Sequence, residues 1–244
     1  MIGALWYGVT LLACTVWYGG KVIVAALAGV PRQAGGVHEA AARGWGATLL
    51  RLHGLRVEVQ GTEIAVAAQP CVFVANHVSF VDTWALVTAI PGSTRFVAKQ
   101  ELRYVPFFGW AMEAAGHIAI DRRNRNAAFD AYERAAVAIH AGASAIVFAE
   151  GTRSRDGTLQ PFKKGPFVLA IAAQVPVVPV YVDGTFNILP KGAGRIRRGP
   201  IRLTFGQPLP TTGLTYDDRD SLSARCRERL LALRPVVDAL ATGR

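Results

Sequence analysis

The sequence predicts an α/β domain with a largely parallel sheet flanked by helices on both faces, and three observations support this. Short apolar runs alternate with amphipathic segments along most of the chain. The runs are apolar almost throughout, as in parallel strands that are buried on both faces. Polar residues suited to chemistry follow several runs, and ligands bind at strand ends in open α/β sheets.

The first half of the domain begins with a helix over residues 38–53, where apolar side chains recur at helical spacing. Residues 55–60 alternate apolar and polar, which indicates a strand, and 71–75 form an apolar run, which indicates a buried strand. An amphipathic helix is expected over 83–90. Two short strands follow, at 94–98 and 117–120.

The second half continues the alternation of strands and helices. Residues 125–141 have a helical pattern that Gly142 ends, and an apolar strand is expected at once, over 144–149. A polar basic loop comes next. The remaining predicted elements are a helix over 166–173, strands over 175–182 and 200–205, and a charged helix over 217–234.

Residues 1–30 predict a membrane-anchoring helix or hairpin ahead of an α/β domain over residues 38–244. The segment carries one charge, Lys21, within an otherwise apolar run, and its length suits a spanning helix or a hairpin in one leaflet. A buried helix of the main core is the alternative. Because no basic residue precedes the run, a signal peptide fits poorly. Aromatic pairs, as at bilayer interfaces, are Trp6, Tyr7, Trp17 and Tyr18.

Composition favours a membrane surface or a phosphorylated substrate as the partner. The 244 residues are 51% hydrophobic, with a net charge of +10 and a mean hydropathy of +0.26. Such a basic and apolar chain suits anionic lipid. No run of five basic residues and no nucleic-acid motif occurs, which argues against nucleic acid. The cysteines at 14, 71 and 226 are scattered, which argues against a disulfide framework or a metal site.

The segment from Asn76 to Asp82 lies between a predicted strand and a predicted helix, and it holds the candidate catalytic pair. His77 and Asp82 can meet only if the histidine lies in the turn and the aspartate in the first helical turn. A carboxylate on one ring nitrogen leaves the other nitrogen free to act as a base. Alternatively, Ser79 and Asp82 form a capping box, and Asp82 serves the backbone.

Three further loops carry groups that suit phosphate. Glu150-Gly151-Thr152-Arg153 follows a strand, and its arginine can bind a phosphate through two parallel hydrogen bonds. Arg122 stands at the end of another strand. Lys163 and Lys164 add two cations further along. Together these loops predict a phosphate beside a general base.

These segments resemble the glycerolipid acyltransferase family, the lysophosphatidate acyltransferases. The resemblance covers roughly residues 70 to 185, with the order and spacing of four motifs intact. One departure is Ala149, where the family usually has proline. The matching segments are 76–82, 99–102 with Pro106 and Gly109-Trp110, 116–122, 148–154 and 175–180.

The resemblance implies an enzyme of phospholipid synthesis that transfers a fatty acyl group to 1-acyl-glycerol-3-phosphate and forms phosphatidate. His77 is then the general base and Asp82 its partner, while residues 150–153 and Arg122 bind the acceptor. Lys163 and Lys164 meet the phosphates of the donor, which is acyl-CoA or an acyl carrier protein thioester; no metal and no cofactor are implied. The expected location is the cell membrane, with the domain on its cytoplasmic side.

Other functions stay open at this point. The acceptor can be another lysolipid or glycerol 3-phosphate, or the chain can be a lipid-binding membrane protein without turnover. The presence of both His77 and Asp82 argues against the second alternative. A membrane-attached nucleic-acid binder would rest on net charge alone. The choice of donor, the acyl-chain length and the oligomeric state have no signature in the sequence.

Overall fold

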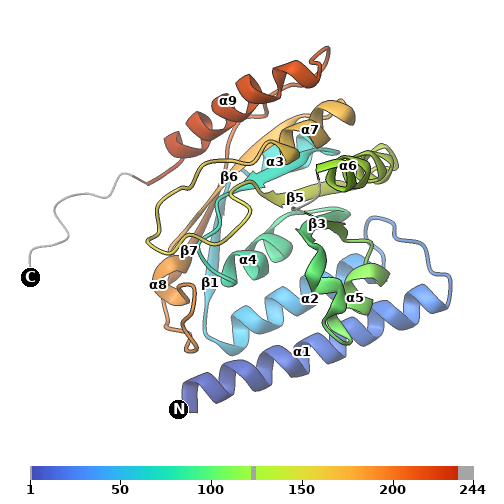
Figure 1. Ribbon diagram of the computed structural model, residues 1–244. Coiled ribbons are helices and arrows are strands. Elements are labelled where there is room, and N and C mark those ends of the chain that lie inside the picture. Colours follow the sequence, from blue (N-terminus) through green and yellow to red (C-terminus); the bar gives the residue numbers. More distant parts are fainter. Residues whose placement is uncertain (1, 122–124, 236–244) are drawn as a thin grey trace, which may run out of the picture.

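The computed structural model describes residues 2–121 and 125–235, and within them one sheet runs through the molecule (Figure 1). Its strand order is β1-β7-β6-β2-β5-β3-β4. Every neighbouring pair is parallel except β6 and β7, so the prediction of a largely parallel sheet is confirmed. The strands are β1 (Arg56–Gln60), β2 (Val72–Ala75), β3 (Thr94–Lys99), β4 (Ile118–Ile120), β5 (Ser144–Phe148), β6 (Val177–Asp183) and β7 (Pro200–Phe205).

The longer helices are confirmed within a few residues at their ends, and the N-terminal segment, predicted as a helix or a hairpin, is a single helix. These are α1 (Ile2–Leu27), α2 (Val37–Leu52), α4 (Val81–Ala89), α6 (Arg125–His140), α7 (Gly165–Ala172) and α9 (Arg219–Ala232). Shorter helices were not predicted, because a helix of one or two turns shows little periodicity. They are α3 (Thr62–Ala67), α5 (Phe108–Ala114) and α8 (Thr185–Ile188), with 3₁₀ turns at Gln100–Tyr104 and Tyr216–Asp218.

Helices cover both faces of the sheet. In Figure 1, α6, α7 and α9 lie above the sheet, and α1, α2 and α4 lie below it. Side chains of β2 alternate between two cores, with Phe73 and Ala75 facing α2 and α4 and Val72 and Val74 facing α6, α7 and α9. All four are fully buried. Burial on both faces explains why the central strands read as continuous apolar runs.

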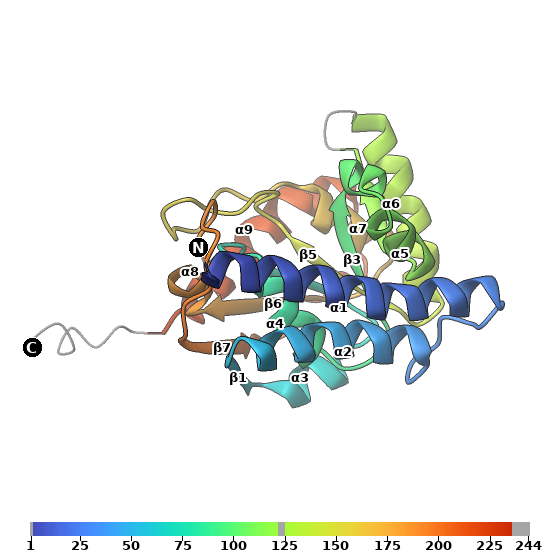
Figure 2. The same cartoon turned by 90° about the horizontal axis from the view of Figure 1, so that it is seen from below.

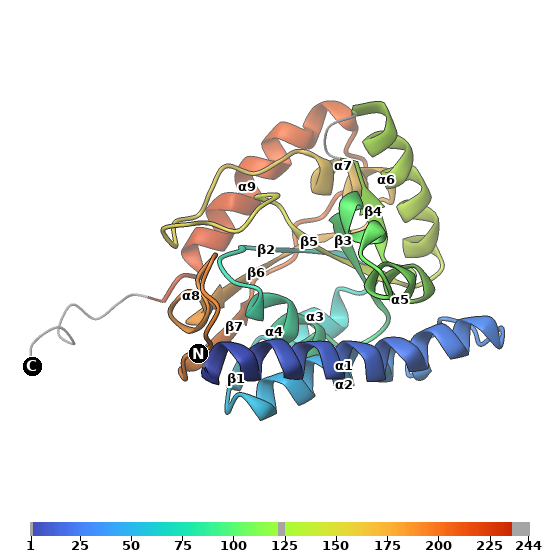
Figure 3. The same ribbon diagram turned by 60° about the horizontal axis from the view of Figure 1, so that its bottom comes forward.

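Helix α1 lies along the domain as one continuous helix, without the bend that a hairpin requires (Figures 2 and 3). Three side-chain hydrogen bonds tie it to α2 and the residue after it: Thr10 to His53, Trp45 to Thr15, and Tyr18 to Thr48. The opposite side of α1 is exposed and apolar. Its large exposed side chains are Ile2, Leu5, Trp6, Val9, Leu12, Val16, Trp17, Val24 and Leu27.

Candidate active site

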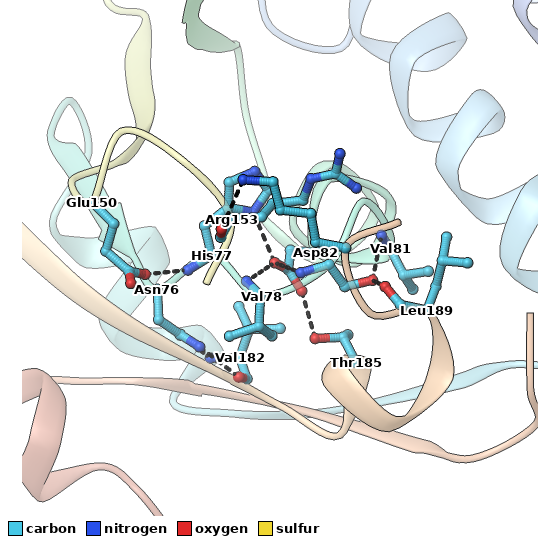
Figure 4. A network of polar contacts seen from close by, with 12 residues as sticks. Asn76, His77, Val78, Val81, Asp82, Glu150, Arg153, Val182, Thr185 and Leu189 are labelled. Atoms are coloured by element: carbon cyan, nitrogen blue, oxygen red, sulfur yellow. Dashed lines mark hydrogen bonds and ion pairs between the residues drawn. The ribbon is translucent and has the colours of Figure 1, made fainter. Parts of the chain in front are cut away.

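The candidate site forms where three neighbouring strands end. Strand β2 lies between β5 and β6, and all three run parallel. Their carboxyl ends therefore meet at one edge of the sheet, which is where open α/β sheets bind ligands. β2 leads into His77, β5 leads into the loop with Arg153, and β6 leads into Thr185 (Figure 4). Segments far apart in sequence thus converge at this edge.

The pair predicted from the sequence is in contact. Nδ1 of His77 donates to Oδ2 of Asp82 at 2.9 Å, and the Asp82 side chain is fully buried. Phe148 stacks on the imidazole, with ring centroids 3.7 Å apart. The carboxylate therefore fixes the tautomer and the aromatic ring fixes the plane. No described residue bonds Nε2, which is left to act on a substrate.

Asp82 also serves the backbone, so both interpretations of this segment hold in part. Its Oδ2 accepts the N–H groups of Val78 and Ser79 at 2.8 and 2.9 Å. The alternative of a capping box holds only in part: the Ser79 N–H donates to Asp82, but the Ser79 hydroxyl accepts the N–H of Val81, and the N-cap of α4 is Phe80. The Ser79 hydroxyl also donates to the carbonyl of Leu189 at 2.8 Å. The same carboxylate thus shapes the turn and orients the histidine.

Residues at the end of β6 stabilise the turn that carries His77 and Asp82. The Thr185 hydroxyl donates to Oδ1 of Asp82 at 2.5 Å. The Asn76 side chain bonds both the carbonyl and the N–H of Val182, at 2.9 and 2.7 Å, and so links the ends of β2 and β6 (Figure 4). Asp82 accepts four hydrogen bonds in all, which suits a buried carboxylate that has left water.

Glu150 lies behind the His77 turn and outside the cavity lining. Its two carboxylate oxygens accept the backbone N–H groups of His77 and Gln160 at 2.6 and 2.7 Å. Burial raises the pKa of Glu150 to about 7, although both hydrogen bonds act to lower it. Glu150 therefore braces the backbone of the base, which differs from the acceptor contact expected from the sequence.

An apolar cavity of about 430 Å³ opens beside His77, a size that suits a small-molecule site. Its walls come from α1, α2, α4, β3 and α5. Burial and the nearby Arg95 lower the pKa of His117 to about 4, so this wall residue is neutral at pH 7. Apolar wall residues include Tyr18, Val22, Trp45, Phe80, Val87, Phe96, Phe108 and Met112.

The polar end of this cavity carries Gly151, Thr152 and Arg153, three of the residues predicted to bind the acceptor. Lys191 joins them, with its Nζ 3.1 Å from the Thr152 hydroxyl. Lys99 also lines the cavity and is paired with Glu101 at 2.8 Å. Positive charge therefore lies at the same end as His77.

Other predicted residues lie elsewhere. Arg122 falls outside the described residues. Lys163 and Lys164 are exposed and do not line the cavity, and Lys164 is paired with Asp220 of α9 at 2.9 Å. Among the described residues, no group of three or more His, Cys, Asp or Glu side chains forms a cluster that could hold a metal ion.

Thr185 and Lys191 were missed by the sequence analysis. Both follow β6, a strand that was predicted, and the strand end was the available signal. No short motif marks them, because their roles depend on β6 lying next to β2.

The fold and the site together define a class: an α/β protein whose histidine–carboxylate pair faces an apolar cavity with positive charge at its mouth. Such a site suits activation of a hydroxyl group beside an acyl chain. The model of the Acyltransferase family matches residues 56–183, more than half of the chain. The chain belongs to this family.

Relatives of known name point to one activity. The chain is 37% identical over 183 residues to human 1-acyl-sn-glycerol-3-phosphate acyltransferase alpha, covering 75% of this chain and 65% of the human protein. It is 37% identical over 156 residues to a chloroplastic 1-acyl-sn-glycerol-3-phosphate acyltransferase of Brassica napus, covering 63% of this chain and 45% of the relative. The chain thus spans about half to two thirds of the length of these relatives.

A solved structure matches along nearly the whole chain. PlsC of Thermotoga maritima, a 1-acyl-sn-glycerophosphate (LPA) acyltransferase, superposes with a TM-score of 0.76 at 26% identity. The match covers 96% of each chain, so it includes α1 as well as the α/β domain.

Proposed function

We propose that this protein transfers a fatty acyl group from a thioester to the free hydroxyl of 1-acyl-glycerol-3-phosphate and so forms phosphatidate. The observation that carries the proposal is the buried Asp82 holding His77, with Nε2 facing an apolar cavity that has Arg153 at its mouth. The names of the relatives supply the acceptor.

In the proposed mechanism, Nε2 of His77 takes the proton of the acceptor hydroxyl as the oxygen attacks the thioester carbonyl. Asp82 stabilises the imidazolium that forms and keeps its ring oriented. The tetrahedral intermediate then collapses, the C–S bond breaks, and the imidazolium returns its proton to the leaving thiolate. His77 thereby ends each cycle in its starting form.

Direct transfer is favoured over an acyl-enzyme. Cys71 is the fully buried residue just before β2 and lies next to Ser144, and burial raises the pKa of its thiol to about 12. A thiol with so high a pKa is not a nucleophile at neutral pH. No Gly-x-Ser-x-Gly segment is present in the sequence either.

We assign the oxyanion donors to the loop after β5. At the start of α4 the N–H groups of Val78 and Ser79 are taken by Asp82, and that of Val81 donates to the Ser79 hydroxyl. Among the described residues, the N–H groups of Thr152 and Arg153 have no such partner. They are adjacent to the cavity, where the carbonyl oxygen gains its charge.

The acceptor is bound through both of its ends. Its phosphate meets Thr152 and Arg153, and an acyl chain occupies the apolar cavity between α1, α2 and α5. Arg122 as a helper at the phosphate, and Lys163 and Lys164 as contacts of the thioester donor, stay predictions. Acyl-CoA and an acyl carrier protein thioester are both compatible with this proposal.

We further propose that α1 lies in one leaflet of the cell membrane, with the domain on the cytoplasmic side. By length and composition α1 could cross a membrane. However, its side chains pack on α2 and α5 along its length, so a spanning orientation would carry charged parts of the domain into hydrocarbon. The exposed apolar side of α1 instead suits an interfacial helix.

Depth-dependent fluorescence quenching of Trp6 and Trp17 tests this placement. Each is measured in a variant in which the other tryptophans are changed to phenylalanine. Quenchers at the acyl-chain boundary of phosphatidylglycerol vesicles should reduce the emission of both residues equally. Strong quenching of one and none of the other would indicate a steeply inserted helix and contradict the proposal.

An acyl-transfer assay tests the proposed reaction. Liposome-bound protein receives a long-chain acyl-CoA and, separately, lysophosphatidate, glycerol 3-phosphate and a zwitterionic lysolipid. Wild type should form phosphatidate, and His77→Ala should form at least about 10³-fold less while binding vesicles normally.

Each other result has a defined meaning. Transfer to another acceptor, again lost in His77→Ala, keeps the mechanism and replaces the acceptor. Unchanged activity in a folded His77→Ala variant removes His77 as the base. If the wild type shows no acyl transfer from either acyl-CoA or an acyl carrier protein thioester but binds lysolipid saturably, a lipid-binding protein is favoured.

A further inference from the structure

The segment from Thr185 to Lys191 begins just past the part of the chain that the family model matches, yet it is bonded to the site at three points. Thr185 bonds Asp82, and the Leu189 carbonyl accepts the Ser79 hydroxyl. Ser79 also forms an isolated β-bridge with Pro190. The position of Lys191, the next residue, is therefore fixed relative to His77.

Lys191 lines the cavity, and its ammonium group is oriented by two contacts with the loop after β5. Its Nζ lies 3.1 Å from the Thr152 hydroxyl and 3.4 Å from the Arg153 carbonyl oxygen. Both of these acceptors are neutral, so they orient the ammonium group without cancelling its charge. A third N–H of the ammonium group is left for a ligand.

Two cations that have no carboxylate partner among the described residues, Lys191 and Arg153, line this cavity. No carboxylate of the described residues lies within 4 Å of the charged groups of Lys191 or Arg153. Both residues line the same cavity as His77. Two positive charges in the lining of an apolar cavity suit an anion that carries two negative charges and an apolar tail.

We propose that Lys191 is a phosphate ligand that, together with Arg153, makes the site selective for an acceptor with a phosphate monoester. Arg153 supplies a planar fork for two oxygens, and Lys191 supplies a point charge for the third. A phosphate monoester carries about two negative charges at pH 7, whereas a phosphate diester carries one. This proposal rests on the proposed function, whose acceptor is such a monoester.

Kinetics of Lys191→Gln and Lys191→Arg test the role of Lys191. For Lys191→Gln the KM for lysophosphatidate should rise about tenfold, while kcat and the KM for acyl-CoA change less than about threefold. Lys191→Arg should restore the acceptor KM to within about threefold of wild type, because it keeps the charge. Arg197→Gln is the matched control, since it removes an exposed cation from the same loop that does not line this cavity.

Competition separates phosphate binding from a merely structural role. Inorganic phosphate should inhibit Lys191→Gln about tenfold more weakly than wild type, while a monoacylglycerol, which lacks phosphate, should inhibit both equally. If both compounds inhibited Lys191→Gln more weakly than wild type, and by the same factor, the cavity would be distorted and the proposal would be overturned.

Three other results would also overturn it. They are an unchanged acceptor KM in Lys191→Gln, a rise in the KM for acyl-CoA instead, and an equal effect of Arg197→Gln. A wild type that forms no phosphatidate is a different failure, because it refutes the proposed function before Lys191 is examined.

Discussion

The two sides of His77 are built differently. On one side Asp82 is fully buried and accepts four hydrogen bonds, from His77, Val78, Ser79 and Thr185. On the other side Lys191 is exposed, and its ammonium group bonds two neutral oxygens, the Thr152 hydroxyl and the Arg153 carbonyl. On the buried side, the hydrogen bonds of Asp82 fix the geometry before substrate binds. On the open side, the positive charge of Lys191 is available to a ligand.

This difference suggests a division of labour. A preorganised buried network suits the chemical step, because it needs no rearrangement in the transition state. Exposed cations suit recognition, since they exchange water for phosphate on binding. Changes on the buried side should therefore reduce kcat and stability, and changes on the open side should raise KM.

The largest effect is expected from Asp82→Asn. All four partners of Asp82 donate hydrogen bonds to it, and an amide would replace one acceptor oxygen by an N–H donor. His77 would then adopt the wrong tautomer, and the N–H groups of the turn would lose an acceptor. We expect kcat to fall on the order of 10³-fold or more. Initial rates with saturating acceptor measure this loss. Asp217→Asn, an exposed carboxylate on the α9 side, is the matched control and should keep full activity; a small loss in Asp82→Asn would contradict the account.

A smaller effect is expected from Glu150→Gln, and it depends on pH. The pKa of Glu150 is about 7 in the folded protein, above the ordinary 4.5, so its stabilising contribution is full below pH 4.5 and is lost as the pH rises through 7. Glutamine does not titrate. The free energy of unfolding of wild type should therefore fall, relative to that of the variant, by roughly 2 to 3 kcal/mol between pH 5 and pH 8.

Urea unfolding of both proteins at pH 5, 6, 7 and 8 measures that difference. The gap between the two free energies should change across this range and flatten above pH 8. Parallel pH profiles would show that Glu150 titrates at its ordinary pKa and that its burial does not govern its charge.

The smallest effect is expected from Thr185→Val, which keeps the shape of the side chain. It removes one of four donors to Asp82. The free energy of unfolding should fall by about 1.5 kcal/mol, the low end for a hydrogen bond to a charged group. The value of kcat should fall about tenfold, with KM unchanged. An effect on KM alone would place Thr185 with the open side.

Much of this architecture could be predicted from the sequence because the relevant signals are local. The apolar run before His77 marked β2, and the five-residue spacing to Asp82 required the turn that the structure has. The loop after β5 was recognised in the same way, by the end of an apolar run. Helices of several turns were found because their spacing repeats.

The rest depends on contacts that local patterns do not encode. Glu150 reads as a polar loop residue, but the packing of the loop against β2 buries it beneath the backbone of His77. Thr185 and Lys191 enter the site only because β6 pairs with β2. In the sequence, α1 is apolar apart from Lys21, and its division into a packed side and an exposed side appears only with α2 beside it.

A direct comparison of His77→Gln with Lys191→Gln tests the central claim, that the buried side performs the chemistry and the open side recognises the acceptor. Steady-state kinetics with lysophosphatidate and acyl-CoA would be measured for both variants beside wild type. The account predicts that His77→Gln loses kcat with little change in acceptor KM, and that Lys191→Gln raises acceptor KM with little change in kcat. If both variants changed the same parameter, or if the two patterns were exchanged, the division between the two sides of His77 would be wrong.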